Sequence, residues 1–503
     1  MAVRPEPSGP AASPSGQLIF PTALSSRSEK VSELLVRQFV RDIAQGRLVP
    51  GTVLPPEPAM LNHLGVGRST LREALRVLSI YGVIAMRPGP VTPVVEQVTS
   101  VQFARSSTLY FHLVGASLRH LLEARQVLSP LVARVAAGKS DRSTRQLLMP
   151  HVQRSSRSRS AELVTGVEGA EFHRSIGLAC RNPILRLFDA GLDDLYLERL
   201  GPRTIPPEEA RRIAREHEQI AEAIVTGQEQ ESERLMAAHM ASYMGSVHQQ
   251  YTTQLDDVLD WRSSEGTARR FELVARQIAR SIAQGKIRPG TLMPPEAVLV
   301  EEFGVSRGTL REALRVLEVY GVIKIRAGRN GGPIVQQVDS HQFARSATLY
   351  FNLVGATLWD LLEARAVISP AVAGLAAVMA DRQARAVLAE NIAAAEAAWP
   401  GDTDLWRQLH TEFHADVARL SFNPILQMFD GAMSHLHDER LWRFEPNEAE
   451  ARTTTSYHEE IAEAIINRDG TGASRLMAEH MTAAMSSAYL QHSLRLEDVL
   501  DWR

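Results

Sequence analysis

The chain contains almost no cysteine and no long apolar run, and each scarcity excludes a class of protein. Cys180 is the single cysteine among 503 residues, which excludes a disulfide framework and a cysteine-based zinc site and favours a reducing cytoplasm. No uninterrupted apolar stretch approaches the roughly 20 residues of a membrane span, so no membrane partner is expected. Residues 1–27 are rich in Pro, Ser and Ala, lack the pattern of a signal peptide and are expected to form a disordered tail.

What the sequence does contain, it contains twice. RSTLREALRVLSIYGVI begins at Arg68 and RGTLREALRVLEVYGVI begins at Arg307, while DDVLDWR and EDVLDWR close the two halves. The offset between the copies is 239 at Arg68 and 241 at Trp261, whose counterpart is Trp502. Solenoid repeats usually have periods of only tens of residues. The chain is therefore a whole protein duplicated in tandem, and its function must be explained first for one copy.

The net charge of −3 conceals a difference between segments. Residues 268–338 hold 12 Lys and Arg against 6 Asp and Glu, whereas the matching residues 28–98 hold 8 against 6. The net charges of these segments are +6 and +2, so the remainder of the chain carries −11. A basic segment beside a larger acidic body indicates a polyanion-binding head. A basic patch alone also fits a solvated face, so the sequence motif of this segment must distinguish the two interpretations.

Residues 268–338 carry the signals of two helices, a short turn, a third helix and a hairpin. The first helix is amphipathic and ends at Gly285, and the second is short and ends at Gly304. The third begins after Ser306, which is a favourable N-cap. VIKIRAGRNGGPIVQQV then predicts two strands around a glycine-rich tip. This order predicts a winged helix-turn-helix, and residues 28–98 predict a second one.

The remainder of each copy, residues 99–262 and 339–503, is almost entirely helical and predicts a bundle of about six or seven helices. Pro370 is expected to kink or break a long apolar helix. The Arg- and Ser-rich segment Lys139–Ser160 is expected to be frayed. The predicted fold class is mainly α, with two winged helix-turn-helix domains that have small β wings, each followed by an all-α bundle.

These motifs resemble a known family. The segment IAQGKIRPGTLMPPEAVLVEEFGVSRGTLREALRVLEVYGVIKIRAGRNGGPIV is similar to the winged helix-turn-helix of GntR-type transcription regulators, and the helical body resembles their FCD (FadR-like) sensor domain. The resemblance covers nearly the whole chain and occurs twice. It implies a cytoplasmic regulator that binds double-stranded operator DNA and a small effector. We name the segments head one (28–98), sensor domain one (99–262), linker (263–267), head two (268–338) and sensor domain two (339–503).

The start of the predicted recognition helix carries the candidate DNA contacts. In such motifs this end enters the major groove, where Arg can pair bidentately with guanine. The predicted contacts are Arg307, Thr309, Arg311, Arg326, Arg329 and Gly331 in head two, and Arg68, Thr70 and Arg72 in head one. The alternative is that Arg311 and Arg315 only form ion pairs on the helix surface with Glu312 and Glu318.

Head one departs from head two in several places. Gly67 replaces the N-cap Ser306, and the wing RPGPVTPVV has lost a glycine pair and its charges beyond Arg87. Pro58 and Ala297 stand where the family usually has Arg, which puts one contact in doubt in both heads. We expect head one to dock on DNA more weakly than head two.

Histidines recur at matched spacing in the two sensor domains. His410 and His414 share one helix face, because they are four residues apart, and His458 and His480 lie 22 residues apart on later helices. Neutral imidazole suits zinc, nickel, copper and iron. A lone histidine is more often a core or surface residue, but matched sets in both copies favour ligands. The predicted ligands are His410, His414, His458 and His480 in copy two, and His173, His217 and His239 in copy one.

The family resemblance bears on this site. In metal-binding FCD domains the first ligand is usually an Asp one turn before the helical His; His410 stands there in copy two and Gly169 in copy one. The expected cofactor is a divalent transition metal, zinc or nickel, and the expected effector is an organic acid at its open positions. Candidate pocket residues are Arg125, Arg365, Asn182 and Asn423, for which a structural ion pair and a helix cap are the alternatives.

Other functions remain as alternatives. A metal-dependent enzyme has a similar site, but no Ser/His/Asp, Cys/His or P-loop arrangement appears, so we expect no enzyme. A metal-free sensor of an acyl-CoA or fatty acid is the second alternative. The short linker predicts either an intrachain pseudo-dimer or a homodimer of tandem chains.

Overall fold

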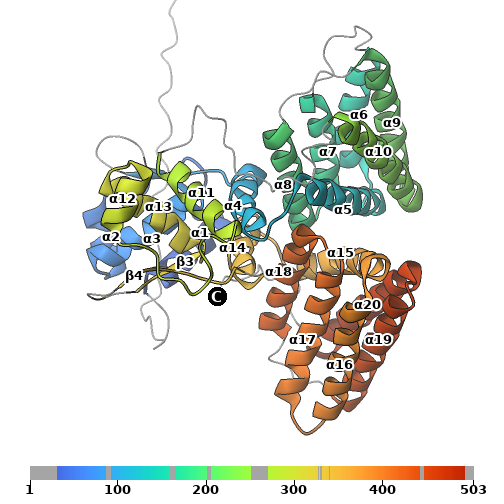
Figure 1. Cartoon of the computed structure of the whole chain (residues 1–503). Coiled ribbons are helices and arrows are strands. Elements are labelled where there is room, and N and C mark those ends of the chain that lie inside the picture. Colours follow the sequence, from blue (N-terminus) through green and yellow to red (C-terminus); the bar gives the residue numbers. More distant parts are fainter. Residues whose placement is uncertain are drawn as a thin grey trace, which may run out of the picture. The chain divides into compact units, whose positions relative to one another are not determined.

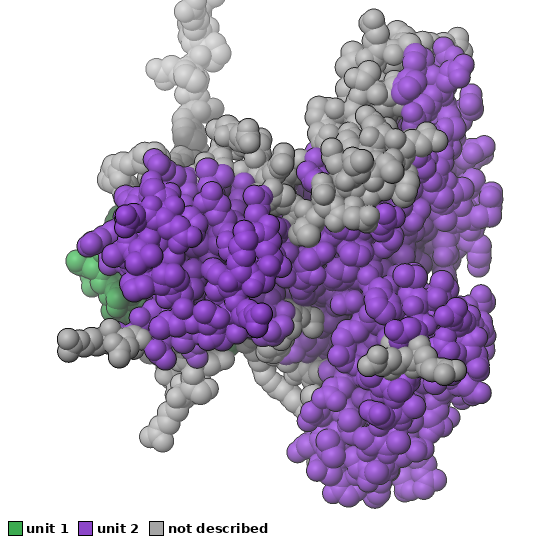
Figure 2. All heavy atoms as spheres, in the orientation of Figure 1, with its two compact units in different colours: residues 1–97, 503 green, residues 98–502 purple. Residues whose placement is uncertain are grey.

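The computed structural model describes residues 31–86, 92–157, 166–200, 206–250, 270–326, 328, 331–338, 340–441 and 447–492. The predicted tail 1–27 and the linker 263–267 lie outside them. The chain forms two compact units, Met1–Gln97 with Arg503 and Val98–Trp502, which Figure 2 distinguishes by colour. The first unit contains head one, and the second contains head two and both sensor domains. The fold is mainly α, as the sequence predicts (Figure 1).

Head one is a winged helix-turn-helix with a small apolar core. Its elements are α1 (Val31–Ala44), α2 (Glu57–Leu64), α3 (Arg68–Ile80), β1 (Ile84–Met86) and β2 (Pro93–Val95). The buried stripe of α3 is formed by Leu71, Leu75 and Leu78, which recur at helical spacing. β1 pairs antiparallel with β2, with Ile84 opposite Val95. The packed core thus fixes α3 with its polar face turned outward.

Head two repeats this arrangement and adds the predicted N-cap. Its elements are α11 (Arg270–Ala283), α12 (Glu296–Phe303), α13 (Arg307–Val319), β3 (Ile323–Arg326) and β4 (Gly332–Val335). Ser306 Oγ accepts a hydrogen bond from the Thr309 backbone N at 3.1 Å, whereas Gly67 supplies no side-chain cap to α3. Gly304 ends α12 in the left-handed conformation, with φ of +59°, which glycine adopts without strain.

Sensor domain one is a helical bundle. Its helices are α4 (Ser100–Leu113), α5 (Leu118–Gly138), α6 (Arg142–Arg157), α7 (Gly166–Ala179), α8 (Pro183–Leu200), α9 (Pro207–Val225) and α10 (Glu229–Gln250). The expected fraying of Lys139–Ser160 is wrong for residues 142–157, which are helical. Asp141 starts α6, because its Oδ1 accepts hydrogen bonds from the backbone N of Ser143 and of Thr144. Residues 158–160 lie outside the described part of the chain.

Sensor domain two has the same order of helices. They are α14 (Ser340–Leu353), α15 (Leu358–Met379), α16 (Arg382–Ala398), α17 (Thr403–Leu420), α18 (Pro424–Leu441), α19 (Glu448–Ile466) and α20 (Gly470–His492). The long apolar segment breaks at Gly355, with φ of +70°, and α15 continues through Pro370. A break at Pro370 is therefore wrong, and a kink there stays a prediction. Helix α15 starts after Thr357, whose side chain forms a capping box with Asp360.

One helix of the described residues is long and apolar enough to resemble a membrane span. It is α15, with a mean hydropathy of 1.6 in its most apolar window. Most of that window, 61%, is buried within the protein, where α15 packs against α17 and α20. These contacts are those of a core helix in a bundle.

The second unit contains contacts that cross between the copies. The Tyr110 hydroxyl on α4 donates to the Tyr320 carbonyl at the end of α13, at 2.9 Å, and α4 packs against α11. Head two therefore rests partly on a helix of copy one. In return, the Tyr350 hydroxyl on α14 donates to the Gln102 carbonyl of α4 at 3.1 Å.

The two sensor domains contact each other reciprocally. Asn182 Nδ2 donates to Glu363 Oε2 at 2.7 Å, and Asn423 Nδ2 donates to Glu123 Oε2 at 3.3 Å. The rings of Phe188 and Phe429, which occupy matching positions, stack with centroids 3.8 Å apart. Such exchange of equivalent contacts is the signature of a two-fold interface, here within one polypeptide.

Candidate functional site

The candidate DNA-reading residues of head two lie at the exposed start of α13. Arg307 and Arg311 are exposed, and Thr309 is half-buried beside the N-cap Ser306. Arg311 Nε donates to Glu296 Oε2 at 3.0 Å, yet 67% of its side chain remains exposed. Ion pairs this exposed contribute at most about 1 kcal/mol, so phosphate or guanine can replace Glu296 at small cost.

The alternative based on ion pairs along the helix surface is only partly seen. Arg315 pairs with Glu318 at 3.0 Å, and Arg311 pairs with Glu296 on α12. The contact between α12 and α13 therefore orients Arg311 at the start of the helix.

In head one two arginines share one carboxylate. Arg68 Nε lies 3.2 Å from Glu57 Oε1, and Arg72 Nε lies 3.0 Å from Glu57 Oε2. Thr70 is half-buried next to them. Both arginine side chains remain more than half exposed, at 68% and 60%, so their outer nitrogens stay accessible.

The wing of head two ends in a tight turn that contains glycine. Arg326 ends β3 and is exposed, and Gly328 has φ of +111°, a conformation that favours glycine. The Gly331 backbone N donates to the Gly328 carbonyl at 2.9 Å, which closes the turn. Arg329 and the wing residue Arg87 of head one lie outside the described residues, so their DNA contacts stay predictions.

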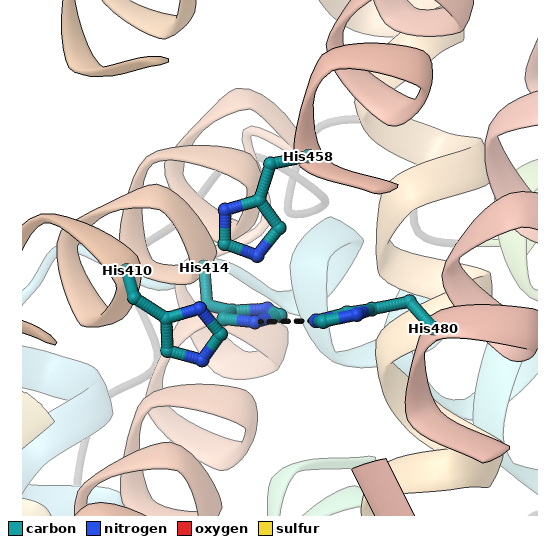
Figure 3. Close-up of side chains that lie close together, drawn as sticks. All are labelled: His410, His414, His458 and His480. Atoms are coloured by element: carbon teal, nitrogen blue, oxygen red, sulfur yellow. Dashed lines mark hydrogen bonds between the residues drawn. The ribbon is translucent and has the colours of Figure 1, made fainter. Parts of the chain in front are cut away.

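The four histidines of sensor domain two converge, as their spacing predicts. Figure 3 shows His410 and His414 from α17, His458 from α19 and His480 from α20 around one point. One nitrogen of each ring lies within 4.8 Å of one nitrogen of every other. His480 Nε2 and His414 Nε2 are 3.4 Å apart, as the dashed line in Figure 3 marks.

Burial makes these imidazoles suitable as neutral ligands. It lowers the pKa of His414, His458 and His480 well below the usual range, and the charge of His410 lowers each further. His458 Nε2 is buried and has no hydrogen-bond partner among the described residues. An unpartnered buried nitrogen costs free energy unless something satisfies it. A bound metal ion would do so, and the donor set therefore fits one.

Sensor domain one brings together the three histidines predicted there. His173 on α7, His217 on α9 and His239 on α10 each offer a nitrogen within 4.8 Å of the others. His217 Nε2 is buried without a hydrogen-bond partner in the described structure, as is its counterpart His458. Glu216 Oε2 contacts His239 Nδ1 at 2.7 Å, which fixes the ring as outer partners of metal ligands do.

The fourth position of this cluster holds Gly169 in place of His410. A Cβ atom added at Gly169 meets no heavy atom within 4 Å among the described residues, so the place of the missing side chain is open. The side chain of nearby Glu168 lies outside the described part of the chain. Three imidazoles still form a ligand set of the kind that catalytic zinc sites use.

Both candidate pocket arginines are buried, and Arg125 forms the structural ion pair that is the alternative to a pocket role, which itself stays a prediction. Arg125 on α5 forms an ion pair with Asp193 on α8 and lies 4.7 Å from the ring centroid of Tyr196 and 5.9 Å from that of Tyr243. Arg365 on α15 donates to Ser434 Oγ at 3.4 Å. A comparison of the two copies along α8 and α18 could have revealed this difference, because Asp193 aligns with Ser434.

The candidate pocket residues Asn182 and Asn423 have a structural role. Asn182 Oδ1 accepts from the backbone N of Ile184 at 3.0 Å and so caps α8, and its amide contacts the other sensor domain. Asn423 does the same for α18 and accepts from Ile425 at 3.1 Å. These contacts agree with the helix-cap alternative, and a role in a pocket stays a prediction.

Comparison with known proteins gives a consistent result. The family description "Bacterial regulatory proteins, gntR family" matches residues 32–94 and 271–330, and "FCD domain" matches residues 120–242 and 360–483. The putative HTH-type transcriptional regulator RmpR of Mycobacterium gastri is 28% identical over 42% of this chain and 77% of its own length. The galactonate operon transcriptional repressor of Escherichia coli is 28% identical over 41% of this chain and 91% of its own length.

Among solved structures, Streptococcus agalactiae GntR is 21% identical and matches 43% of this chain and all of its own, with a TM-score of 0.33. The relatives are transcription regulators and not enzymes. Both family descriptions match twice, once in each copy. The chain therefore belongs to the gntR family of DNA-binding transcription regulators with FCD domains, in a form that carries both domains twice in one polypeptide.

Proposed function

We propose that this regulator senses a small organic acid at a zinc or nickel ion bound by the four histidines of sensor domain two. The observation that carries the proposal is the buried, unpartnered His458 Nε2 within a cluster of neutral imidazoles. Zinc and nickel both accept imidazole ligands, and a bound ion supplies a Lewis-acid position for a carboxylate. The buried guanidinium of Arg365 supplies a second positive charge for the same anion.

A relative's name agrees with an acidic effector. One relative is the repressor of the galactonate operon, and galactonate is a hydroxy acid with a carboxylate and neighbouring hydroxyl groups. Such a molecule can present oxygen to a metal ion and a negative charge to an arginine. We infer that the effector of this chain belongs to the same chemical class.

The heads would read an imperfect palindrome in the operator. Two-fold regulators place recognition helices in half-sites about one helical turn apart. The stronger half-site would lie under head two, through Arg307, Thr309 and Arg311, with Arg326, Arg329 and Gly331 of the wing. Head one would occupy the weaker half-site through Arg68 and its neighbours.

We also propose that one chain forms the functional pseudo-dimer and acts in the cytoplasm. The reciprocal contacts of Asn182 with Glu363 and of Asn423 with Glu123 support this, because a homodimer of separate copies would use the same pairs. Light scattering on a short operator should give the mass of one chain. A mass of two chains with protection of more than two half-sites would contradict it.

Metal analysis tests the sensor. Protein purified without chelators should contain zinc or nickel, and citrate, lactate or galactonate should raise the melting temperature of the metal-loaded form. Absence of metal, with no thermal shift on addition of zinc or nickel, would overturn the proposal. A thermal shift with acyl-CoA alone would then establish the metal-free sensor.

A further inference from the structure

Three of the clustered histidines have the same arrangement in both sensor domains. They are His173, His217 and His239 in sensor domain one and their counterparts in sensor domain two. Their ring centroids are 5.4, 5.6 and 4.8 Å apart in sensor domain one, and the matching distances in sensor domain two are 5.3, 5.2 and 5.0 Å. The two clusters therefore differ at the fourth position, where Gly169 is the counterpart of His410.

In sensor domain two the fourth ring completes an aromatic stack. The His458 ring stacks with that of Phe413 at a centroid distance of 3.9 Å and with that of His410 at 4.7 Å. Figure 3 shows the His410 and His458 rings beside each other. Both contacts are nearly parallel, with interplanar angles of 13° and 11°. Because two rings cannot stack on the same face of one imidazole, the His458 ring lies between the other two.

In sensor domain one only one side of this stack is formed by the matching residues. The His217 ring stacks on that of Phe172, with centroids 4.1 Å apart and an interplanar angle of 22°. Gly169 lies one helical turn before His173, which is the position that His410 has in the other copy. A Cβ atom added at Gly169 meets no heavy atom within 4 Å among the described residues. The face of His217 opposite Phe172 therefore points to the place that a ring fills in sensor domain two.

Polar atoms around this place are prepared for a ligand. His217 is 6% exposed, and its Nε2 has no hydrogen-bond partner within the described parts of the chain. A buried nitrogen of this kind costs free energy unless it is bound. Glu216 Oε2 contacts His239 Nδ1 at 2.7 Å, which leaves the Nε2 of that ring for a metal ion. Gly169 is only half-buried, so a small molecule can reach the place from solvent.

We propose that sensor domain one binds a small azole, a planar five-membered ring with a nitrogen donor, in the place left open at Gly169. The ring stacks on His217, and its nitrogen supplies the fourth ligand of a metal ion held by the three imidazoles. His410 of sensor domain two shows that a ring of this size and donor type fits the position, whereas a simple carboxylate has no ring to cover His217. The site is separate from the four-histidine site proposed to sense an organic acid and depends only on metal binding in sensor domain one.

Cobalt provides the test, because it accepts imidazole ligands and has a visible spectrum that reports them. In the full chain, His458→Ala with His480→Ala removes ligands from sensor domain two. Cobalt bound to this variant should take up one imidazole per chain, with a saturable change in absorption. Addition of Gly169→His should weaken imidazole binding by more than about 10-fold, because the new side chain fills the fourth position. An imidazole affinity that Gly169→His leaves unchanged would overturn the inference.

The reciprocal change is the matched control. His410→Gly, in a chain with His217→Ala and His239→Ala, should create an imidazole site in sensor domain two at saturating cobalt. Acetate should bind more weakly than imidazole at either site, and equal or tighter binding of acetate would overturn the assigned ligand class. Imidazole uptake by sensor domain one only after Glu168→Ala or His151→Ala would show that the chain itself supplies the fourth ligand, and would also overturn the inference.

Two further measurements separate this inference from the proposed acid sensor. Imidazole should raise the melting temperature of the zinc-loaded wild type more than that of Gly169→His, and this comparison needs no change in sensor domain two. Failure of sensor domain one to bind cobalt would overturn the inference and leave the acid sensor standing. Imidazole binding that persists while organic acids have no effect on the wild type would instead overturn the acid sensor alone.

Discussion

The two copies share a fold but differ at the residues that we propose to bind DNA, metal and effector. Copy two has a capped recognition helix, four converging histidines and a serine beside its buried arginine. Copy one has a glycine at the cap, three histidines and an aspartate at the arginine. The cores of both copies remain packed with matching apolar residues. The duplication thus preserved the scaffold and allowed the two sets of binding residues to diverge.

The largest effect is expected from exchange of the fourth histidine between copies. His410→Gly should weaken metal binding in sensor domain two by more than about 100-fold, because loss of a ligand costs more than loss of an outer partner. Gly169→His should strengthen binding in sensor domain one, where the space is open. Competition with a chromophoric chelator measures both. Unchanged metal affinity in both variants would show that the fourth histidine makes no difference between the copies.

The next effect concerns the two heads. Arg307→Ala or Arg311→Ala should weaken specific operator binding by about 1–3 kcal/mol for each lost base-edge pair. Arg68→Ala or Arg72→Ala should cost less, because head one has the poorer wing and carries less positive charge. Fluorescence anisotropy with a labelled operator measures the losses. Equal losses from the two heads would contradict the predicted asymmetry.

Acidification should destabilise the metal-free protein. The pKa values of His173 and His217 in copy one, and of His414, His458 and His480 in copy two, are lowered by burial, so below about pH 6.5 the unfolded chain binds protons that the native chain does not. Stability is then lost as pH falls, by at most about 1.4 kcal/mol per histidine and pH unit.

Buried carboxyl groups oppose this loss. Burial raises the pKa of Asp189 to about 7 and also raises that of Asp430, so these groups favour the native state as pH falls. With more buried histidines, sensor domain two should lose more stability than sensor domain one. Calorimetry of the apo chain at pH 7.5 and 5.5, with His458→Phe as the reference, tests the balance. Equal stability at both pH values would show that the carboxyl groups cancel the histidines.

The smallest effect is expected at the helix caps. Gly67→Ser should stabilise head one by a few tenths of a kcal/mol, because Ser supplies the side-chain acceptor that α3 lacks. Ser306→Gly should destabilise head two by a similar amount. Urea unfolding of the two variants measures the changes. A loss of stability from Gly67→Ser would contradict the capping argument, because the backbone at Gly67, with φ of −73°, is open to serine.

The sequence alone determined the local elements and which histidines share a helix face. Helical spacing placed His410 and His414 on one face, and Ser306 marked the start of α13, because both depend on residues a few positions apart. The repeat allowed each inference to be checked in a second copy. The position of the turn was less predictable, because the long apolar segment is interrupted at Gly355, whereas the helix continues through Pro370.

Only the tertiary structure decided which distant groups meet. The pairing of Arg125 with Asp193, the stacking of Phe188 on Phe429 and the support of Tyr320 by Tyr110 each join different helices. Such contacts depend on how helices pack, and many packings are compatible with the same pattern of apolar residues. Burial then decides the chemistry, because the same carboxylate or imidazole that is solvated on a surface must find a partner inside the protein.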